Sequence, residues 1–203
     1  MPGRLFLTRD LSSLGAEWDI SGLDHGGPRQ NIAPGQSVIV LTPKGARMMR
    51  WGIIPVGRKN ARGRPVMETI INARSESVFD KSAFEGVGRA VVPADGWYEW
   101  TGKKRKKTAW AIQAKDQSLL YFAAITDVWH GPGGIEVPQV ATVTCEPSAD
   151  VSDIHHRMGV LLTKDQLPVW LGEDQEPAAQ LMRPFPDGLL TVSQAEGVDW
   201  SAP

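Results

Sequence analysis

The segment Arg89–Trp100 constrains the fold more than any other part of this chain. It reads as a buried strand, a turn over Pro93–Gly96, and a second strand that carries one carboxylate, Glu99, among three large aromatic residues. Because side chains of an extended chain alternate between its two faces, Glu99 shares a face with Trp97 and not with its immediate neighbours. The pattern predicts a central hairpin in a β-rich fold.

The environment of Glu99 suggests a role in proton transfer. A carboxylate beside indole rings loses contact with water, and this loss raises its pKa. General acid–base catalysis at neutral pH requires a group of this kind. The alternative is a structural Glu99 that forms a salt bridge with one of the chain's arginines, because structural ion pairs also perturb carboxylates. The local pattern leaves both interpretations open.

The remaining elements are mostly short strands separated by turns. Apolar and β-branched runs predict strands over 37–42, 48–54, 69–72, 109–114, 119–126, 137–144 and 160–162, and helices over 11–19, 82–85, 148–154, 163–170 and 177–182. The strands 109–114 and 119–126 are expected to pair across a turn. Since strands dominate without β–α–β alternation, we expect a single compact α+β domain over residues 1–203, built on a strongly bent, mostly antiparallel sheet with short flanking helices.

Charge is distributed unevenly along this chain of 203 residues, although its net charge is only −1. Eight basic residues and one acid lie between Lys44 and Arg74, and 103–107 is a run of five basic residues that is expected to form a hairpin tip. From Asp165 to Pro203 there are seven acids and one base, Arg183. A basic face on a nearly neutral protein is typical of a polyanion partner, while a solvated loop is the alternative for 103–107.

Several classes of site and location are excluded by simple counts. The single cysteine, Cys145, allows no internal disulfide and no multi-cysteine zinc site, and its apolar surroundings predict a buried thiol. No apolar run reaches the length of a membrane span, and the first residues lack a signal-peptide pattern, so we expect a cytoplasmic protein with no membrane partner. A phosphate loop, a dinucleotide fingerprint and regular metal-ligand spacing are all missing, and neither a metal nor a cofactor is expected.

The histidine pair His155–His156 offers little as a metal site, because adjacent side chains diverge on a regular backbone. Cys145 and His155 are an alternative nucleophile–base pair, although the apolar setting of the thiol argues against it. A more promising set is Asn72, Arg74, Glu99 and His155, which all lie at strand ends or strand-to-loop junctions, where functional side chains are often displayed. Sequence spacing does not show that they meet.

Six short motifs occur in an order that resembles the SOS-response-associated peptidase (SRAP) family of abasic-site shielding proteins. The motifs are Pro2–Arg4, Asn31–Pro34, Arg50–Pro55, Asn72–Glu76, Val92–Trp100 and Ile154–Met158. They span roughly residues 1–171, so residues 172–203 are interpreted as an acidic extension packed on the same domain. The resemblance implies a bifurcated β-sheet flanked by helices, a monomer, and binding of single-stranded DNA.

The resemblance also implies covalent capture of abasic sites by an amino-terminal cysteine, whose amine and thiol close a thiazolidine ring on the sugar aldehyde. The implied catalytic positions are Pro2, Asn72, Glu99 and His155, with Asn72 near the first residue, Glu99 shuttling protons and His155 helping to open the sugar. The implied DNA-binding positions are Arg4, Pro34, Arg50, Trp51, Arg74 and Arg157. Of these, Trp51 and Pro34 would pack against bases or shape the kinked strand, and Arg74 would bind a flanking phosphate.

This chain departs from the family pattern at residue 2, which is Pro2 and carries no sulfur. A thiazolidine cannot form there, but the secondary amine of an amino-terminal proline can still attack an aldehyde and form an iminium ion. Three outcomes remain open: a Schiff-base variant that also cleaves the strand, a non-covalent single-stranded-DNA binder, and a proline introduced by a sequence change. A self-processing peptidase that uses residue 2 or Cys145 is a further alternative.

Overall fold

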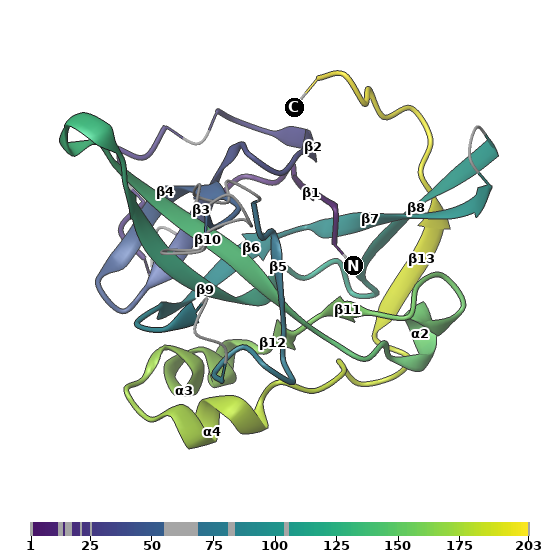
Figure 1. The fold of residues 1–203 in the computed structure, drawn as a ribbon. Helices are drawn as coiled ribbons and strands as arrows, with labels where there is room; N and C mark the ends of the chain where they lie inside the picture. The colour runs from purple at the N-terminus through teal and green to yellow at the C-terminus, as the bar shows by residue number, and fades with distance from the viewer. Residues whose placement is uncertain are drawn as a thin grey trace, which may run out of the picture.

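The computed structural model describes residues 2–11, 14, 18–20, 22–24, 26–54, 69–80, 84–103 and 106–202. Their strands form two sheets that pack into one body, with short helices at its edges (Figure 1). Most neighbouring strands run antiparallel, and the sheets are strongly bent. The predicted class, a single compact α+β domain, is confirmed.

The first sheet has five strands and carries the two ends of the described chain. In spatial order these are β13 (Leu190–Gln194), β8 (Lys106–Ala114), β7 (Gly96–Lys103), β1 (Arg4–Leu7) and β2 (Arg29–Ile32), all antiparallel to their neighbours. The strand β13 was not predicted, because its five residues lie in a polar, acidic part of the sequence. It extends the sheet by pairing with β8.

The second sheet has eight strands. Its order is β11 (Met158–Gly159), β10 (Glu136–Cys145), β4 (Gly45–Trp51), β3 (Ser37–Thr42), β6 (Gly88–Ala94), β9 (Leu120–His130) and β12 (Leu161–Leu162), and β5 (Asn72–Arg74) pairs with β10. Strand β10 runs parallel to β4 and β5 and antiparallel to β9. Because β9 also pairs with β6, the strands β3, β4, β10, β9 and β6 close into a small barrel.

The core fills this barrel and the space between the two sheets. Trp51, Phe122 and Trp97 have no exposed surface, and the rings of Trp97 and Phe122 meet edge to face at 5.6 Å, which joins the sheets. The helices α2 (Ala149–Ser152), α3 (Leu167–Leu171) and α4 (Gln175–Gln180) and the 3-10 turns η2 (Pro132–Gly134) and η3 (Lys164–Gln166) lie outside the sheets. Within the described residues, no helix has the length and apolar character to span a membrane.

Two predicted hairpins are wrong. Strand β6 belongs to the barrel and β7 to the five-stranded sheet, so the predicted turn over 93–96 is a crossing between sheets with a bend at Asp95. Strands β8 and β9, expected to pair, also lie in different sheets. The pairing preference of sequence neighbours fails here because each connection crosses from one layer to the other. At the end of the basic run that the structure describes, Lys103 of β7 pairs with Lys106 of β8, as expected for a hairpin.

The crossing is held by the side chain of Asp95. Its carboxylate accepts hydrogen bonds from the backbone N–H groups of Thr8 (2.6 Å) and Arg9 (3.2 Å), and from Thr8 Oγ1 (3.0 Å) and Arg9 Nε. Its own N–H donates to the carbonyl of Phe6 (2.9 Å). These bonds attach the start of β7 to the end of β1.

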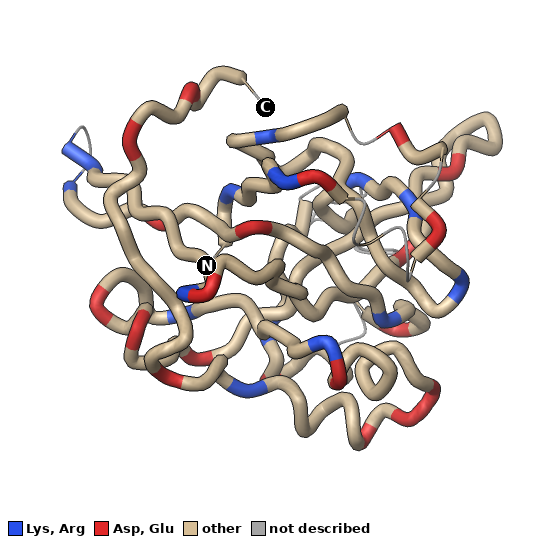
Figure 2. The backbone as a smooth tube through the Cα atoms, turned by 180° about the vertical axis from the view of Figure 1, so that it is seen from behind, with Lys and Arg blue, Asp and Glu red and all other residues tan. Residues whose placement is uncertain are grey.

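The acidic C-terminal segment continues from β13 across the outer side of the five-stranded sheet (Figures 1 and 2). Asn31 Nδ2 donates to the carbonyl of Asp199 (3.2 Å), and the Trp200 ring packs against Tyr98 at 4.9 Å. Four of the eight basic residues counted between Lys44 and Arg74 lie in the segment 55–65, which is outside the described residues, as are parts of the predicted helices 11–19 and 82–85.

Substitution of Gly96 by alanine tests how closely the backbone at the start of β7 packs against its neighbours. A Cβ atom there would lie 2.2 Å from the carbonyl oxygen of Ile112 and 2.5 Å from the Phe6 ring. We expect Gly96→Ala to lower the free energy of unfolding by about 1–3 kcal/mol or more, measured by urea denaturation. Gly88→Ala is the matched control, because its nearest contact is the Thr126 methyl group at 3.2 Å. Equal effects of the two substitutions would refute the steric argument.

Candidate active site

Pro2 is buried, and the side chain of Asn72 holds its carbonyl group. Asn72 Nδ2 donates to the Pro2 carbonyl oxygen at 2.9 Å, and Thr142 Oγ1 donates to Asn72 Oδ1 at 2.6 Å. Thr142 faces Asn72 directly in the parallel pair of β5 and β10. The amide is therefore fixed at both its oxygen and its nitrogen, and the barrel sets the position of the first described residue.

Glu99 lies beside this amino-terminal segment. Strand β1 pairs with β7 so that Arg4 faces Tyr98, and the antiparallel direction then carries Pro2 along the strand past Glu99. The Glu99 side chain is buried, with 4% of its surface exposed. Burial raises the pKa of Glu99 to about 7, while the positive charge of the amino terminus and the Trp97 N–H act in the opposite direction. Glu99 thus holds and releases a proton near neutral pH.

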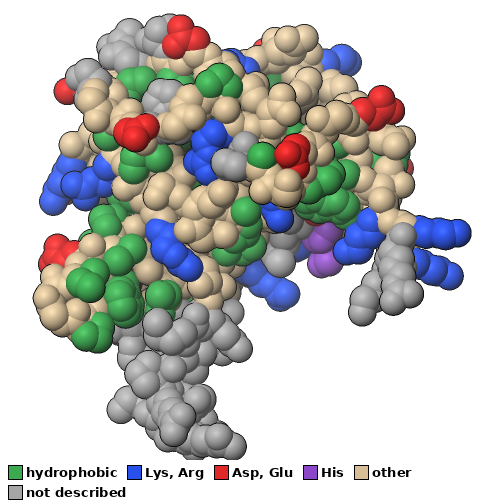
Figure 3. Space-filling view, turned by 90° about the horizontal axis from the view of Figure 1, so that it is seen from above, with side chains coloured by type: hydrophobic (Ala, Val, Ile, Leu, Met, Phe, Trp, Pro, Cys, Tyr) green, Lys and Arg blue, Asp and Glu red, His purple; other side chains and the backbone are tan. Residues whose placement is uncertain are grey.

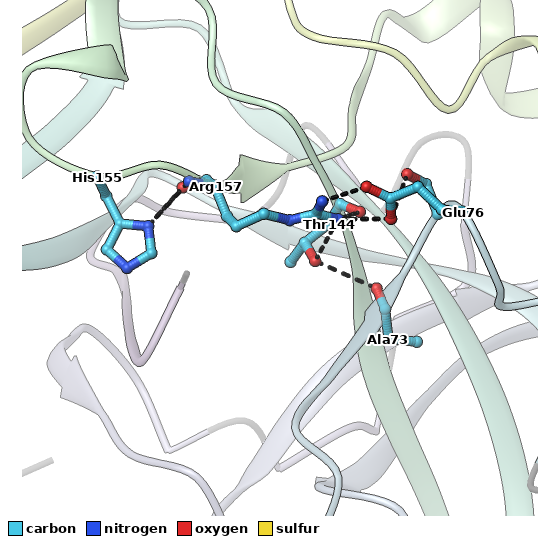
Figure 4. Close-up of polar contacts among 6 residues, drawn as sticks. Ala73, Glu76, Thr144, His155 and Arg157 are labelled. Carbon is cyan, nitrogen blue, oxygen red and sulfur yellow. Dashed lines mark hydrogen bonds and ion pairs between the residues drawn. The ribbon is translucent and has the colours of Figure 1, made fainter.

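His155 is positioned by the turn that follows α2. The backbone N–H of Arg157 lies 2.9 Å from His155 Nδ1, and the Arg157 carbonyl lies 3.1 Å from the same nitrogen. Figure 4 shows Nδ1 turned toward Arg157 and Nε2 turned away from it. Burial lowers the pKa of His155, and the charge of the amino terminus lowers it further. The same positive charge therefore acts on the pKa of both Glu99 and His155.

The two adjacent histidines do not diverge as predicted. Their rings stack at 4.4 Å with 23° between the planes, because the backbone at this point is an irregular turn. His156 is exposed and His155 is partly buried. Among the residues that the structure describes, no three His, Cys, Asp or Glu side chains cluster as metal ligands would.

The predicted DNA-binding residues fall into two groups. Arg74 is exposed at the end of β5, two residues after Asn72, and Pro34 is partly exposed in the turn before β3. Arg4 and Arg50 are partly exposed and make protein contacts: Arg4 donates to Asn31, and Arg50 donates to the Gly52 carbonyl at 2.6 Å. All four side chains are at least partly exposed, and their role in DNA binding stays a prediction.

Trp51 and Arg157 are buried and have structural roles. Trp51 is fully buried and donates its N–H to the carbonyl of Ile71 at 3.1 Å, so the prediction that a base stacks on it is wrong. Arg157 is 8% exposed and contacts both oxygens of Glu76 and the carbonyl of Thr144 at 2.5 Å (Figure 4). Its guanidinium joins β10 to the segment after β5 and is not presented to a phosphate.

Cys145 offers no nucleophile. It is 3% exposed, and burial raises the pKa of its thiol to about 12. A thiol in this state carries almost no thiolate at neutral pH. The alternative pair of Cys145 and His155 therefore lacks its reactive species.

Sequence reasoning missed two residues of the site. Thr142 orients Asn72, and Trp110 faces Glu99 across β7 and β8. Both depend on strand register, and the alternating pattern of β8 and β10 gives the face of each residue but not its partner. Only the pairing itself reveals them.

Glu99→Gln should change the pH dependence of stability. Below about pH 4.5 the Glu99 carboxyl is protonated in both the folded and the unfolded protein. As the pH rises from 4.5 toward 7, the unfolded chain releases this proton first, so the wild type loses stability. The shift from 4.5 to about 7 corresponds to about 3 kcal/mol. We expect Glu99→Gln to match the wild type at pH 4 and to exceed it by up to that amount above pH 7.5, measured by denaturation at each pH.

The exposed Glu146 provides the control for this titration. Glu146→Gln is expected to change stability by less than about 0.5 kcal/mol across the range. A stability difference between wild type and Glu99→Gln that is the same at pH 4 and pH 8 would contradict the burial of an ionisable Glu99.

Arg157→Met should destabilise the fold because it leaves the buried carbonyl of Thr144 without this donor and removes the Glu76 contact. We expect a loss of about 2–4 kcal/mol in thermal or urea unfolding. Glu76→Gln is expected to cost about 1 kcal/mol or less, since its side chain is 54% exposed. If Arg157→Met unfolds like the wild type and only weakens DNA binding, the structural role is wrong.

Comparison with known proteins gives a consistent result. The family model described as SOS response associated peptidase (SRAP) matches residues 1–197. The abasic site processing protein YoqW of Bacillus subtilis is 30% identical over 169 residues, which cover 78% of this chain and 74% of that protein. The abasic site processing protein HMCES of Gallus gallus is 32% identical over 159 residues, which cover 66% of this chain and 47% of that protein.

Solved structures share the fold. A protein from Bacteroides thetaiotaomicron superposes with a TM-score of 0.80 at 21% identity, covering 96% of this chain and 92% of that chain. A protein from Bordetella bronchiseptica gives a TM-score of 0.79 at 19% identity, covering 96% of this chain and 99% of that chain. At these identities the likeness concerns the fold alone.

Proposed function

The chain belongs to the SOS response associated peptidase (SRAP) family, and on that premise we propose that it acts on abasic sites in single-stranded DNA through its amino-terminal residue. The relatives named above are abasic site processing proteins, which supports an abasic nucleotide as the substrate. The observation that carries the proposal is the position of Pro2, whose carbonyl is held by Asn72 at 2.9 Å next to the buried Glu99.

The reactive group is the secondary amine of Pro2, formed when Met1 is removed. The open sugar of an abasic site carries an aldehyde at its first carbon. The proline nitrogen adds to this carbon, the nitrogen loses its proton, and the carbonyl oxygen becomes a hydroxyl group. Departure of that hydroxyl as water leaves an iminium ion between nitrogen and carbon.

Glu99 supplies and removes the protons of this sequence. With a pKa of about 7 it is protonated in about half of the molecules near neutral pH, and the acid form donates to the departing hydroxyl. The resulting carboxylate then faces the iminium cation. From there it can take a proton from the neighbouring sugar carbon, and the electron pair of that C–H bond expels the 3′ phosphate.

Asn72 and His155 have supporting roles in this scheme. Asn72 fixes the carbonyl of the reacting residue and so limits the directions from which its nitrogen approaches the sugar. His155 has a lowered pKa, is neutral at pH 7, and is suited to exchange a proton with the sugar ring oxygen or hydroxyl as the ring opens. In this proposal Arg74, which is exposed two residues beyond Asn72, binds a flanking phosphate.

A second candidate function is non-covalent binding of single-stranded DNA. The absence of sulfur from Pro2 favours it, because the thiazolidine that the family resemblance implies needs a thiol at this position. A cysteine-type peptidase is the weaker alternative, since the thiol of Cys145 is buried and protonated.

Borohydride trapping separates the covalent and non-covalent candidates. An iminium ion reduced by borohydride becomes a stable amine, so protein whose first residue is confirmed as Pro2 by intact mass should form a covalent adduct with an abasic oligonucleotide only when borohydride is present. Glu99→Gln should slow adduct formation by about 10²- to 10⁴-fold in single-turnover measurements. An intact oligonucleotide of the same sequence is the control, and an adduct-free reaction would leave the non-covalent candidate.

Pro2→Cys is the matched variant for residue 2. It introduces the missing thiol next to the amine, so it should form an adduct with the same oligonucleotide without borohydride. If Pro2→Cys reacts and the wild type does not, the pocket is competent and the amine of Pro2 is not the nucleophile. If neither reacts, the proposed active site is wrong.

A further inference from the structure

The hairpin of β7 and β8, called the arm here, continues the active site outward from Glu99. The inner face of the arm consists of three facing pairs: Glu99 with Trp110, Thr101 with Thr108, and Lys103 with Lys106. Directly opposed residues in an antiparallel pair project to the same side with Cβ atoms about 4.5–5.5 Å apart. The inner face is therefore a ladder that begins at Glu99 and ends in two lysines.

Burial decreases steadily along this face. One pair further inward, Trp97 and Ile112 have no exposed surface. Glu99 is buried, Trp110 is partly exposed, and the lysine pair at the tip is exposed. Exposure to solvent therefore increases from Glu99 outward along the arm.

The opposite face of the arm is covered by the chain itself. Trp100 projects to that side, where the ring of Trp200 packs against it at 5.3 Å. The C-terminal segment reaches this face after it continues the ladder of β13 and β8 with a hydrogen bond from the Ala195 N–H to the Ala109 carbonyl at 2.9 Å. On the inner face, Thr101, Thr108 and Trp110 are partly exposed, so a ligand can reach them.

Trp110 is held in a defined orientation on the inner face. Its indole N–H donates to Thr101 Oγ1 at 2.8 Å, across the two strands of the arm. A fixed aromatic ring followed by cations is the combination that single-stranded nucleic acids recognise, through base stacking and phosphate contacts. Figure 3 shows basic side chains gathered at the projecting end of the arm.

We propose that the inner face of the arm binds the single strand on one side of the abasic nucleotide, with a base stacked on Trp110 and phosphates at Lys103 and Lys106. This inference rests on the proposed function, because the abasic sugar at Glu99 sets where the strand enters the arm. It adds a binding surface for the strand on one side of the abasic nucleotide.

The length of the arm sets the number of nucleotides involved. Residues two apart on a strand are separated by about 6.8 Å, so the lysine pair lies about 14 Å from the Glu99 pair. That distance corresponds to about four stacked nucleotides at 3.4 Å each, and to fewer in a stretched strand. The stacked base on Trp110 belongs to a nucleotide close to the abasic site.

Binding of fluorescein-labelled single strands without an abasic site tests the role of Trp110. Fluorescence anisotropy should show that Trp110→Ala weakens binding by about 5- to 150-fold, whereas Trp110→Phe stays within a few-fold of the wild type because it retains a stacking ring. Trp129→Ala is the matched control, because Trp129 is a partly exposed tryptophan on β9, which pairs with β10 away from the arm. Thermal unfolding of each variant checks that the fold is retained.

The lysines are tested by salt dependence and by one-sided substrates. Lys103→Ala with Lys106→Ala should reduce the slope of log affinity against log salt by about 1.4, while Lys115→Ala at the other end of β8 should not change it. Abasic oligonucleotides that extend by six nucleotides on only the 5′ or only the 3′ side should lose affinity in the lysine and Trp110→Ala variants for one of the two extensions.

The outcomes distinguish this inference from the proposed function. If the wild type is trapped by borohydride and Trp110→Ala binds every strand as well as Trp129→Ala does, the inference about the arm is overturned and the covalent chemistry stands. If Trp110→Ala weakens binding of intact strands while no protein is trapped, the arm is supported and the covalent chemistry is overturned. A loss shared equally by Trp110→Ala and Trp110→Phe also overturns the stacking role.

Discussion

The structure depends on the junction at Asp95, where the chain leaves the barrel and enters the five-stranded sheet. Burial by itself raises the pKa of Asp95, but hydrogen bonds from Thr8 and Arg9 outweigh it and hold that pKa below its ordinary value. The carboxylate therefore stays charged and keeps its donors at neutral pH. These contacts fix the end of β1 against the start of β7, and with them the pairing of Arg4 with Tyr98. Because that register decides which residue of β7 lies beside Pro2, a structural carboxylate four residues before Glu99 sets the geometry of the candidate active site.

The features that follow from local sequence could be predicted. The number of short strands and the absence of β–α–β alternation indicate an α+β domain, and the fold agrees. Alternation along Trp97–Trp100 placed Glu99 on the same side as an indole, and desolvation there does raise its pKa to about 7. The family resemblance placed Asn72 near the first residue, and Asn72 donates to the carbonyl of Pro2. Each of these predictions depends on side-chain alternation, on the number of strands or on a short motif, and all three can be read from the sequence.

The features that depend on strand partners could not be predicted. A period of two shows which side chains share a face, but it does not show which strand is the neighbour in the sheet. The connections β6–β7 and β8–β9 each join two sheets and do not form hairpins. Trp51 follows an arginine in a motif that resembles a DNA-binding one, but β10 and β3 enclose it on both sides. Arg157 is likewise a cation in a motif whose partner, Glu76, lies 81 residues away. Burial of these two side chains comes from long-range pairing, and no property of their own segments signals it.

Proline at residue 2 changes the electrostatics of the proposed reaction as well as its bonds. A thiazolidine is a neutral ring, whereas the iminium of a secondary amine has no N–H to lose and keeps its positive charge. A cation formed beside a buried carboxyl lowers the pKa of that carboxyl, because the opposite charge favours the ionised form. Glu99 would thus donate its proton before the iminium exists and act as a base once it does, without any movement of the backbone. The same burial that destabilises an ionised Glu99 in the free protein makes the carboxylate–iminium attraction strong, since screening by water is weak there. In the proposed reaction a proline amine would therefore favour a transient, elimination-prone adduct over the lasting crosslink that a thiol would give.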